Sequence, residues 1–185
     1  MLDYIAMGMV LHEPLTGYDI KKEIQAGVGN FYAASYGSLY PALKKLTDKG
    51  YLTVTEHAQG KRKKKYYEAT ELGKAAFIEW LSLPYDPNSS DPVVARIYFF
   101  GELPADIRKR QLQDYEQHQL QVLHKLEAME KRFAISVPTD REYFELCTLY
   151  LGLQQVHDAV RWFRYINKRR PLPEFVRKDD EFERE

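Results

Sequence analysis

The feature that most constrains the fold is a change in the spacing of apolar residues at Gly50. Before it, apolar residues recur every three or four positions, which is typical of amphipathic helices. After it, the segments 51–56 and 65–70 are rich in β-branched and aromatic residues, which favours strands. Gly60 lies between these segments, where a hairpin would turn. The pattern therefore predicts helices, then a β-hairpin, then helices again.

Three helices are expected before the hairpin, over about 2–12, 16–26 and 36–49. Thr16 and Ser35 are suitable N-caps for the second and third of them. Gly50 follows the third helix as the αL residue that commonly ends a helix. The residues expected to be buried in the second and third helices are Tyr18, Ile20, Ile24, Leu39, Leu43 and Leu46.

The second half of the chain is predicted to be helical. A fourth helix, about 71–82 with Leu72 buried, precedes a proline-rich connection that is not expected to be helical. A short helix at about 91–100 and long helices over 104–134 and to about 168 follow. Apolar residues in the long helices alternate three- and four-residue spacings, as in packed helices or coiled coils. The last helix carries this stripe at Leu146, Leu149, Leu153, Val156, Val160 and Phe163.

Three helices followed by a two-stranded hairpin have the order of a winged helix-turn-helix domain. The fold class expected is therefore mainly α with a small β-hairpin, in which this domain precedes a helical dimerisation domain. The expected divisions are a winged helix-turn-helix domain at 1–82, a linker at 83–91, a dimerisation domain at 92–170 and a flexible tail at 171–185.

A recognition helix must bury one face in its own domain and offer the other to a DNA groove. The segment 36–49 satisfies this, and the wing supplies consecutive cations that can lie along phosphates. Lys44 and Lys45 lie on different helix faces, so one of them is expected to reach DNA, and packing is the alternative for Tyr40. The predicted DNA-binding residues are Ser35, Tyr36, Ser38, Tyr40, Lys44, Lys45, Gly60, Lys61, Arg62, Lys63 and Lys64.

Catalytic and metal sites are not expected. The five histidines form no HExxH pattern, and no P-loop, GxSxG or GxGxxG motif occurs. The single Cys147 excludes an internal disulfide framework and a cysteine-rich zinc site. Neither a cofactor nor an enzymatic activity is expected. No apolar stretch reaches the roughly 20 residues of a membrane span, and the first residues do not read as a secretory signal, so a cytoplasmic location is expected.

Several segments together resemble the PadR family of transcriptional regulators over about residues 1–80. The matching segments are Thr16–Ile20, Ser38–Leu46, Lys49–Leu52, Gly60–Tyr67 and Thr70–Gly73. Residues 91–168 are similar, in helix pattern, to the C-terminal region of larger members related to virulence activators. The resemblance implies a repressor more often than an activator, double-stranded DNA with a pseudo-palindromic operator as partner, and in some members an aromatic effector.

The resemblance also implies a homodimer whose C-terminal helices exchange, with the first helix joining the interface. The last helix supports this, because it carries apolar residues such as Tyr143, Cys147 and Trp162 outside its stripe. The dimerisation residues expected are Leu2, Ile5, Leu146, Leu149, Tyr150, Leu153, Val156, Val160 and Phe163.

Alternatives remain for each of these interpretations. The Lys61–Lys65 run could be a solvated hairpin tip, and the apolar stripes could form a core within one chain. The winged helix could serve as a protein–protein adaptor without DNA binding. A small-molecule binding protein or enzyme could occupy the helical half, although no cluster of titratable residues suggests it.

Overall fold

The computed structural model describes residues 1–32, 34–59, 62–86, 92–133, 139–173 and 175. Its contacts divide the chain into two compact units, Met1–Ala105 and Asp106–Glu185. No helix in the described ranges is long and apolar enough to cross a membrane. The first unit extends beyond the predicted linker at 83–91, and most of the predicted tail at 171–185 lies outside the described residues.

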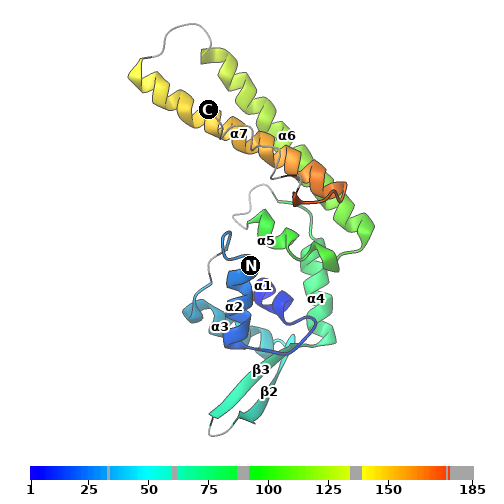
Figure 1. Cartoon of the computed structure of the whole chain (residues 1–185). Helices are drawn as coiled ribbons and strands as arrows, with labels where there is room; N and C mark the ends of the chain where they lie inside the picture. The colour runs from blue at the N-terminus through cyan, green and yellow to red at the C-terminus, as the bar shows by residue number, and fades with distance from the viewer. Residues whose placement is uncertain (33, 60–61, 87–91, 134–138, 174, 176–185) are drawn as a thin grey trace. The chain divides into compact units, whose positions relative to one another are not determined.

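The first unit contains the predicted order of helices and strands (Figure 1). Its elements are α1 (Leu2–Met9), β1 (Leu15–Thr16), α2 (Gly17–Gly27), α3 (Tyr36–Asp48), β2 (Leu52–Gln59), β3 (Arg62–Ala69), α4 (Glu71–Ser82), α5 (Val93–Ile97) and the 3₁₀ helix η1 (Phe100–Glu102). The short strand β1 was not expected; it pairs with β3, so the sheet has the antiparallel order β1-β3-β2.

Helix α1 is the centre of this unit and contacts α2, α3 and α4. Ile5, Ala6 and Met7 are fully buried there. Gly8 lies so close to the Phe77 and Phe99 rings that an added Cβ would come within 2.9 Å of both. The short helices after α4 therefore close the same core, because Phe99 packs edge-on against Phe77 with ring centroids 5.3 Å apart.

Arg96 of α5 fastens this segment to the end of α4. Its Nη2 donates to the carbonyl oxygens of Leu83 at 2.6 Å and Leu81 at 3.0 Å. A helix leaves its last carbonyl groups without partners within the helix, and a cation is favoured at that end. The predicted helix at 91–100 is in fact the short α5 followed by η1, and it belongs to the first unit.

The second unit is a helical hairpin of α6 (Ala105–Phe133) and α7 (Asp140–Asn167), which lie side by side (Figure 1). Leu123, Leu149 and Leu153 form its buried centre, with Leu120, Leu126, Leu146 and Val156 packed around them. Tyr115 stacks on Phe163 with ring centroids 5.5 Å apart. The predicted stripe on the last helix therefore packs first against its own chain.

Candidate DNA-binding surface

The predicted recognition helix is α3, and its start is fixed by a capping box. The Ser35 Oγ accepts the backbone N–H of Ser38 at 3.2 Å, and the Ser38 Oγ accepts the N–H of Ser35 at 3.2 Å. Both serines are exposed, but their hydroxyls are already used in this reciprocal cap. The remaining N–H groups of the first turn are a favourable place for a phosphate.

Two tyrosines stand on the outer face of α3. Tyr36 and Tyr40 are exposed and stack with ring centroids 6.1 Å apart. The Lys21 Nζ lies 3.6 Å from the centroid of the Tyr36 ring, a cation–π distance. Leu39 and Leu43 on the opposite face are buried. Helix α3 therefore has one face packed in its own domain and one face open to a partner, as a recognition helix requires.

The two adjacent lysines of α3 have different roles. The Lys45 Nζ donates to Asp3 of α1 at 2.6 Å, and this hydrogen bond raises the pKa of Lys45. Lys44 points elsewhere and is largely exposed, with Asp48 one turn away at 3.4 Å. Of the pair, Lys44 is therefore the one available to a ligand outside the domain, and Lys45 ties α3 to α1.

The wing differs from the prediction in where its basic residues lie. The ladder between β2 and β3 continues to the pair Gln59–Arg62, so the lysines after Arg62 are strand residues and not a loop tip. Gly60 and Lys61 lie outside the described residues, and Arg62 is described in its backbone only. A run of charges does not decide where a ladder ends, because alternating exposed positions of a hairpin accept lysines equally well.

Alternation along β3 separates the lysines into two sets. Lys63 and Lys65 share one face and lie 3.6 and 3.7 Å from the carboxylate of Glu56. The Lys64 side chain lies on the opposite face of β3; Lys64 pairs with His57 in the strand register and is exposed. Within the described part of the chain, no acidic side chain pairs with Lys64, so its charge is available to a partner.

The start of α2, the middle of α3 and the wing meet around one cavity of about 430 Å³. Its lining combines hydroxyl groups and cations that can bind a phosphate. The lining residues are Thr16, Gly17, Tyr18, Asp19, Tyr40, Lys63, Lys64, Lys65 and Tyr67. Of these, Tyr40, Lys63 and Lys64 were predicted to contact DNA.

Gly17 permits the close approach of α2 and α3 at this cavity. A Cβ at position 17 would lie 2.8 Å from the Cε1 of Tyr40. Tyr18, predicted to be buried, is 63% exposed, and that prediction was wrong. Tyr18 is two residues from the buried Ile20, which places it about 200° away around the helix.

Sequence reasoning missed the contribution of the short strand β1 and of Tyr67. Strand β1 pairs Thr16 with Tyr66 and so brings the N-terminus of α2 beside β3. Burial raises the pKa of the Tyr67 phenol, and the nearby Tyr40 raises it further. Tyr67 is therefore protonated at neutral pH and can donate a hydrogen bond. A two-residue strand has no periodic signal by which it could have been found.

The predicted dimerisation residues divide into buried and accessible sets. Ile5 is buried in the first unit; Leu149, Leu153, Val160 and Phe163 are buried in the second. Leu2, Leu146 and Val156 are partly buried, and only Tyr150 is exposed. The single chain thus already covers most of the stripe, and the role of these residues in a dimer stays a prediction.

A second apolar stripe on α7 is open in the single chain. It consists of the exposed residues Tyr143, Phe144, Cys147, Tyr150 and Leu151. Cys147 lies four residues from Tyr143 and Leu151 and three from Phe144 and Tyr150, so the five residues lie on one helix face. Contiguous exposed apolar surface of this kind marks contact sites in soluble proteins. We call these five residues the open stripe.

No group of three or more metal-ligating side chains occurs among the described residues.

Leu72 of α4 was predicted to be buried, but it is 59% exposed, so that prediction was wrong.

Comparison with known proteins gives matches along nearly the whole chain. A model for the transcriptional regulator PadR-like family matches residues 7–79, and one for the virulence activator alpha C-term region matches residues 91–169. The negative transcriptional regulator PadR of Bacillus subtilis (strain 168) is 32% identical in an alignment of 177 residues that covers 90% of this chain and 95% of that protein.

Two crystal structures of Bacillus subtilis PadR are also similar to this chain. The structure in complex with operator DNA is 27% identical over 90% of this chain and 97% of the other, with a TM-score of 0.45. The structure in complex with p-coumaric acid is 27% identical over 90% and 96%, with a TM-score of 0.42.

Proposed function

Since this chain belongs to the PadR-like family of transcriptional regulators, we propose that it represses transcription by binding double-stranded DNA as a homodimer. In the proposed complex, α3 enters the major groove and the β2–β3 wing follows the neighbouring phosphates. Two copies would place their α3 helices in successive major grooves, about 34 Å apart, on a pseudo-palindromic operator. Repression, rather than activation, is proposed because the Bacillus subtilis relative is a negative regulator.

The observation that carries the DNA-binding proposal is the cavity where three elements meet. Tyr40, Lys63 and Lys65 of β3 and the N-terminal turn of α2 line a space of about 430 Å³, and each offers hydrogen-bond donors. Donors of these kinds bind phosphate oxygens and fix the register of a protein on the duplex. The outer face of α3, with Tyr36 and Lys44, remains for the groove itself.

We assign the contact between the two copies to the open stripe of α7. It exposes Tyr143, Phe144, Tyr150 and Leu151, each by more than half of its surface. A two-fold interface uses the same surface on both subunits, and a single helix face can meet its own copy in this way. The proposed regulator is cytoplasmic and acts by binding, without a catalytic step.

The sharpest test within the surface replaces one lysine at a time. Lys64→Ala removes the wing cation that has no acidic partner among the described residues, whereas Lys74→Ala removes a lysine of α4 that pairs with Glu71 at 2.8 Å. Each phosphate contact releases about one counterion, so the slope of log affinity against log salt should fall by about 1 for Lys64→Ala. The control should keep both affinity and slope.

An unchanged affinity and salt slope in Lys64→Ala would contradict the assignment of the wing to phosphates. If neither the natural chain nor its variants bound DNA at low salt, the adaptor function would replace DNA binding. The measurement is a fluorescence anisotropy titration on one labelled operator fragment at several salt concentrations.

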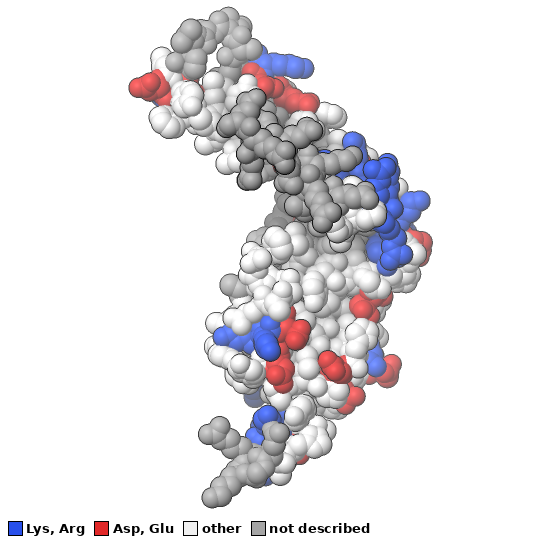
Figure 2. Space-filling view, in the orientation of Figure 1, with Lys and Arg blue, Asp and Glu red and all other residues white. Residues whose placement is uncertain are grey.

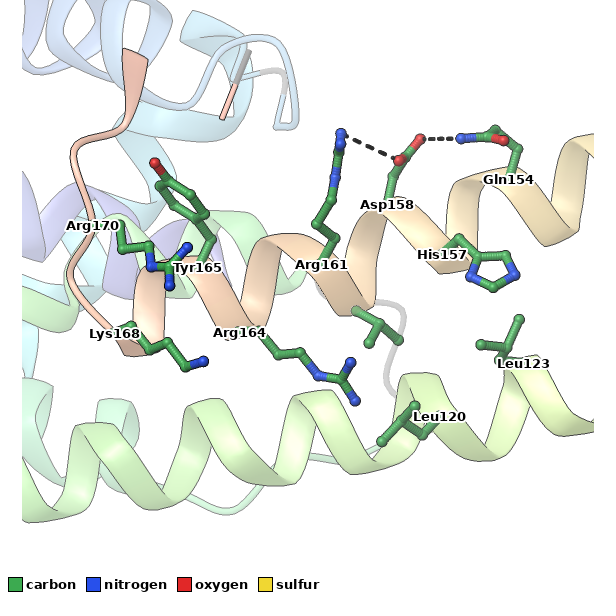
Figure 3. Close-up of a pocket in the computed structure, with 11 residues that line it drawn as sticks. Leu120, Leu123, Gln154, His157, Asp158, Arg161, Arg164, Tyr165, Lys168 and Arg170 are labelled. Atoms are coloured by element: carbon green, nitrogen blue, oxygen red, sulfur yellow. Dashed lines mark hydrogen bonds and ion pairs between the residues drawn. The ribbon is translucent and has the colours of Figure 1, made fainter. Parts of the chain in front are cut away.

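We also propose that a small-molecule effector modulates this DNA binding. An effector shifts an equilibrium only through different affinities for the two states of the protein. The helical unit contains a cavity of about 530 Å³ (Figure 3), a volume within the range of small-molecule sites in proteins.

A further inference from the structure

The first unit, which we assign to DNA, has no excess of positive charge. Lysines and arginines equal aspartates and glutamates in number over residues 1–105. The face of this unit in Figure 2 accordingly shows acidic side chains among the basic ones. Attraction to DNA of any sequence comes from cations that neutralise phosphates. The affinity of this unit for DNA therefore depends on which of its lysines its own acidic residues hold back.

Lys45 of α3 is held by a carboxylate more firmly than its neighbour Lys44. The Lys45 Nζ lies 2.6 Å from the Asp3 carboxylate, whereas the Lys44 Nζ lies 3.4 Å from that of Asp48. The Asp3 side chain is also less exposed, at 28% against 64% for Asp48. A short charged hydrogen bond is stronger than a long one, and salt screens a partly buried pair less than an exposed one. Asp3 therefore competes with a phosphate for Lys45 better than Asp48 does for Lys44.

Lys45 stands at one edge of the outer face of α3. It follows Tyr36 by about two and a half helical turns, so the two residues lie on opposite sides of the helix. A helix about 10–12 Å across fills a major groove about 12 Å wide, which brings both edges of its outer face beside the phosphate backbones. A lysine at such an edge is placed to contact a phosphate once its own partner releases it.

A simpler role for the pair is to tie α3 to α1. Asp3 is in the first turn of α1 and Lys45 is in the last turn of α3, and each charge is favoured at that end of a helix. This role does not account for a carboxylate beside the DNA-facing edge. Such a carboxylate repels phosphates, whereas two neutral side chains would join the helices without that cost.

We propose that Asp3 limits the affinity of this protein for DNA by holding Lys45 away from the phosphates. Lys45 would reach a phosphate only by leaving the Asp3 carboxylate without its cation beside a polyanion, which is unfavourable. Because every sequence carries the same phosphates, the restraint acts on random DNA as well as on the operator. Asp3 is thus a positioning residue that acts through Lys45, and the inference rests on the proposed DNA binding.

The test compares Asp3→Asn with the natural full-length chain in anisotropy titrations on operator and random DNA at several salt concentrations. Release of Lys45 adds one phosphate contact, so the slope of log affinity against log salt should steepen by about 1 for each chain bound. Affinity for both DNAs should rise about 3- to 10-fold for each chain, the effect of one added hydrogen bond. Asp3→Glu keeps the carboxylate and should keep the natural slope.

Variants of Lys45 separate this restraint from a purely structural tie. Asp3→Asn and Lys45→Gln break the same bond, so a structural role alone predicts the same change in DNA binding for both. The restraint predicts that Lys45→Gln binds no more tightly than the natural chain and keeps its slope. It also predicts that Asp3→Asn no longer steepens the slope in a chain that carries Lys45→Gln. Thermal unfolding checks that each variant is folded.

The matched control is Glu23→Gln, which removes an exposed carboxylate of α2 that pairs with no lysine of the described chain. It should keep the natural slope. An unchanged slope in Asp3→Asn, or an equal steepening in the control or in the Lys45→Gln chain, would overturn the inference. Absence of DNA binding by the natural chain would instead contradict the proposed function itself.

Discussion

At the scale of single residues, Gly50 has a conformation that other residues rarely adopt. Its φ is 72°, and its N–H and that of Tyr51 donate to Thr47 and Leu46 in a Schellman motif. A Cβ there would meet nothing within 4 Å, so the cost of a substitution is purely conformational. Gly50→Ala should reduce the free energy of unfolding by about 1 kcal/mol.

The control for this prediction is Gly101→Ala, where a Cβ also meets open space but φ is not positive. That variant should be neutral or slightly more stable. Arg169→Gly should have the opposite sign to Gly50→Ala, because Arg169 now occupies the left-handed region with a side chain. Urea unfolding of the three variants measures these differences, and equal losses in Gly50→Ala and Gly101→Ala would contradict the conformational explanation.

Gly17 has a different importance, because it determines where Tyr40 lies. The Cβ of Gly17→Ala would approach the Tyr40 ring to 2.8 Å, and an exposed tyrosine can move away at little cost in stability. We expect DNA affinity to fall about 3- to 10-fold, the effect of losing one hydrogen bond, with stability nearly unchanged. Binding titrations beside thermal unfolding would show this; a large loss of stability would argue for a structural role instead.

At the scale of elements, α7 begins with a charged cap that predicts a pH dependence. The Glu142 carboxylate accepts the backbone N–H of Thr139 at 2.8 Å and its hydroxyl at 2.8 Å, and these hydrogen bonds lower the pKa of Glu142. A carboxyl group whose pKa is lower in the folded state stabilises the fold above its ordinary value of 4.5. This contribution is lost as the pH falls through the lowered pKa.

Glu142→Gln should therefore melt at a lower temperature than the natural chain at pH 7, and the gap should close as the pH falls below about 4.5. Differential scanning calorimetry at a series of pH values is the measurement. Glu127→Gln, an exchange of the same kind on α6, is the control. A gap that stays constant with pH would show that the carboxylate charge contributes nothing to the cap.

The elements also show how far sequence reasoning extends. The helical period predicted α2, α3 and α4 closely, and the turn residues Thr16, Ser35 and Gly50 have the capping roles expected of them. The lysine run was misplaced into a loop, because charge alone does not indicate where strand pairing ends. Helix α5 belongs to the first unit because Arg96 donates to the end of α4 and the neighbouring Phe99 packs on Phe77. These contacts join residues that are distant in the sequence, and no local pattern encodes them.

At the scale of the whole molecule, a stripe of apolar residues cannot by itself distinguish an internal core from an interface. Leu149 and Leu153 are buried against α6, yet their spacing is the one expected for a contact between two chains. The neighbouring open stripe shows the surface that remains after the chain has covered its own core. Only packing in three dimensions separates the two sets.

The open stripe predicts the behaviour of a charged variant. Tyr150→Glu/Leu151→Glu should yield monomers, because association would bury two uncompensated carboxylates, and DNA affinity should fall with the loss of the second binding head. Light scattering gives the mass in solution. Gln121→Glu, at an exposed position of α6, should leave the oligomer intact; a dimer that persists in the double variant would refute the assigned interface.

The most direct test of the central claim is a titration of the full-length chain with the DNA upstream of its own coding sequence, beside a random sequence of equal length. We predict selective binding that weakens steeply with salt, with two chains bound per operator. Equal affinity for the two sequences, or no binding at low salt, would contradict the account of α3 and the wing as a DNA-reading surface.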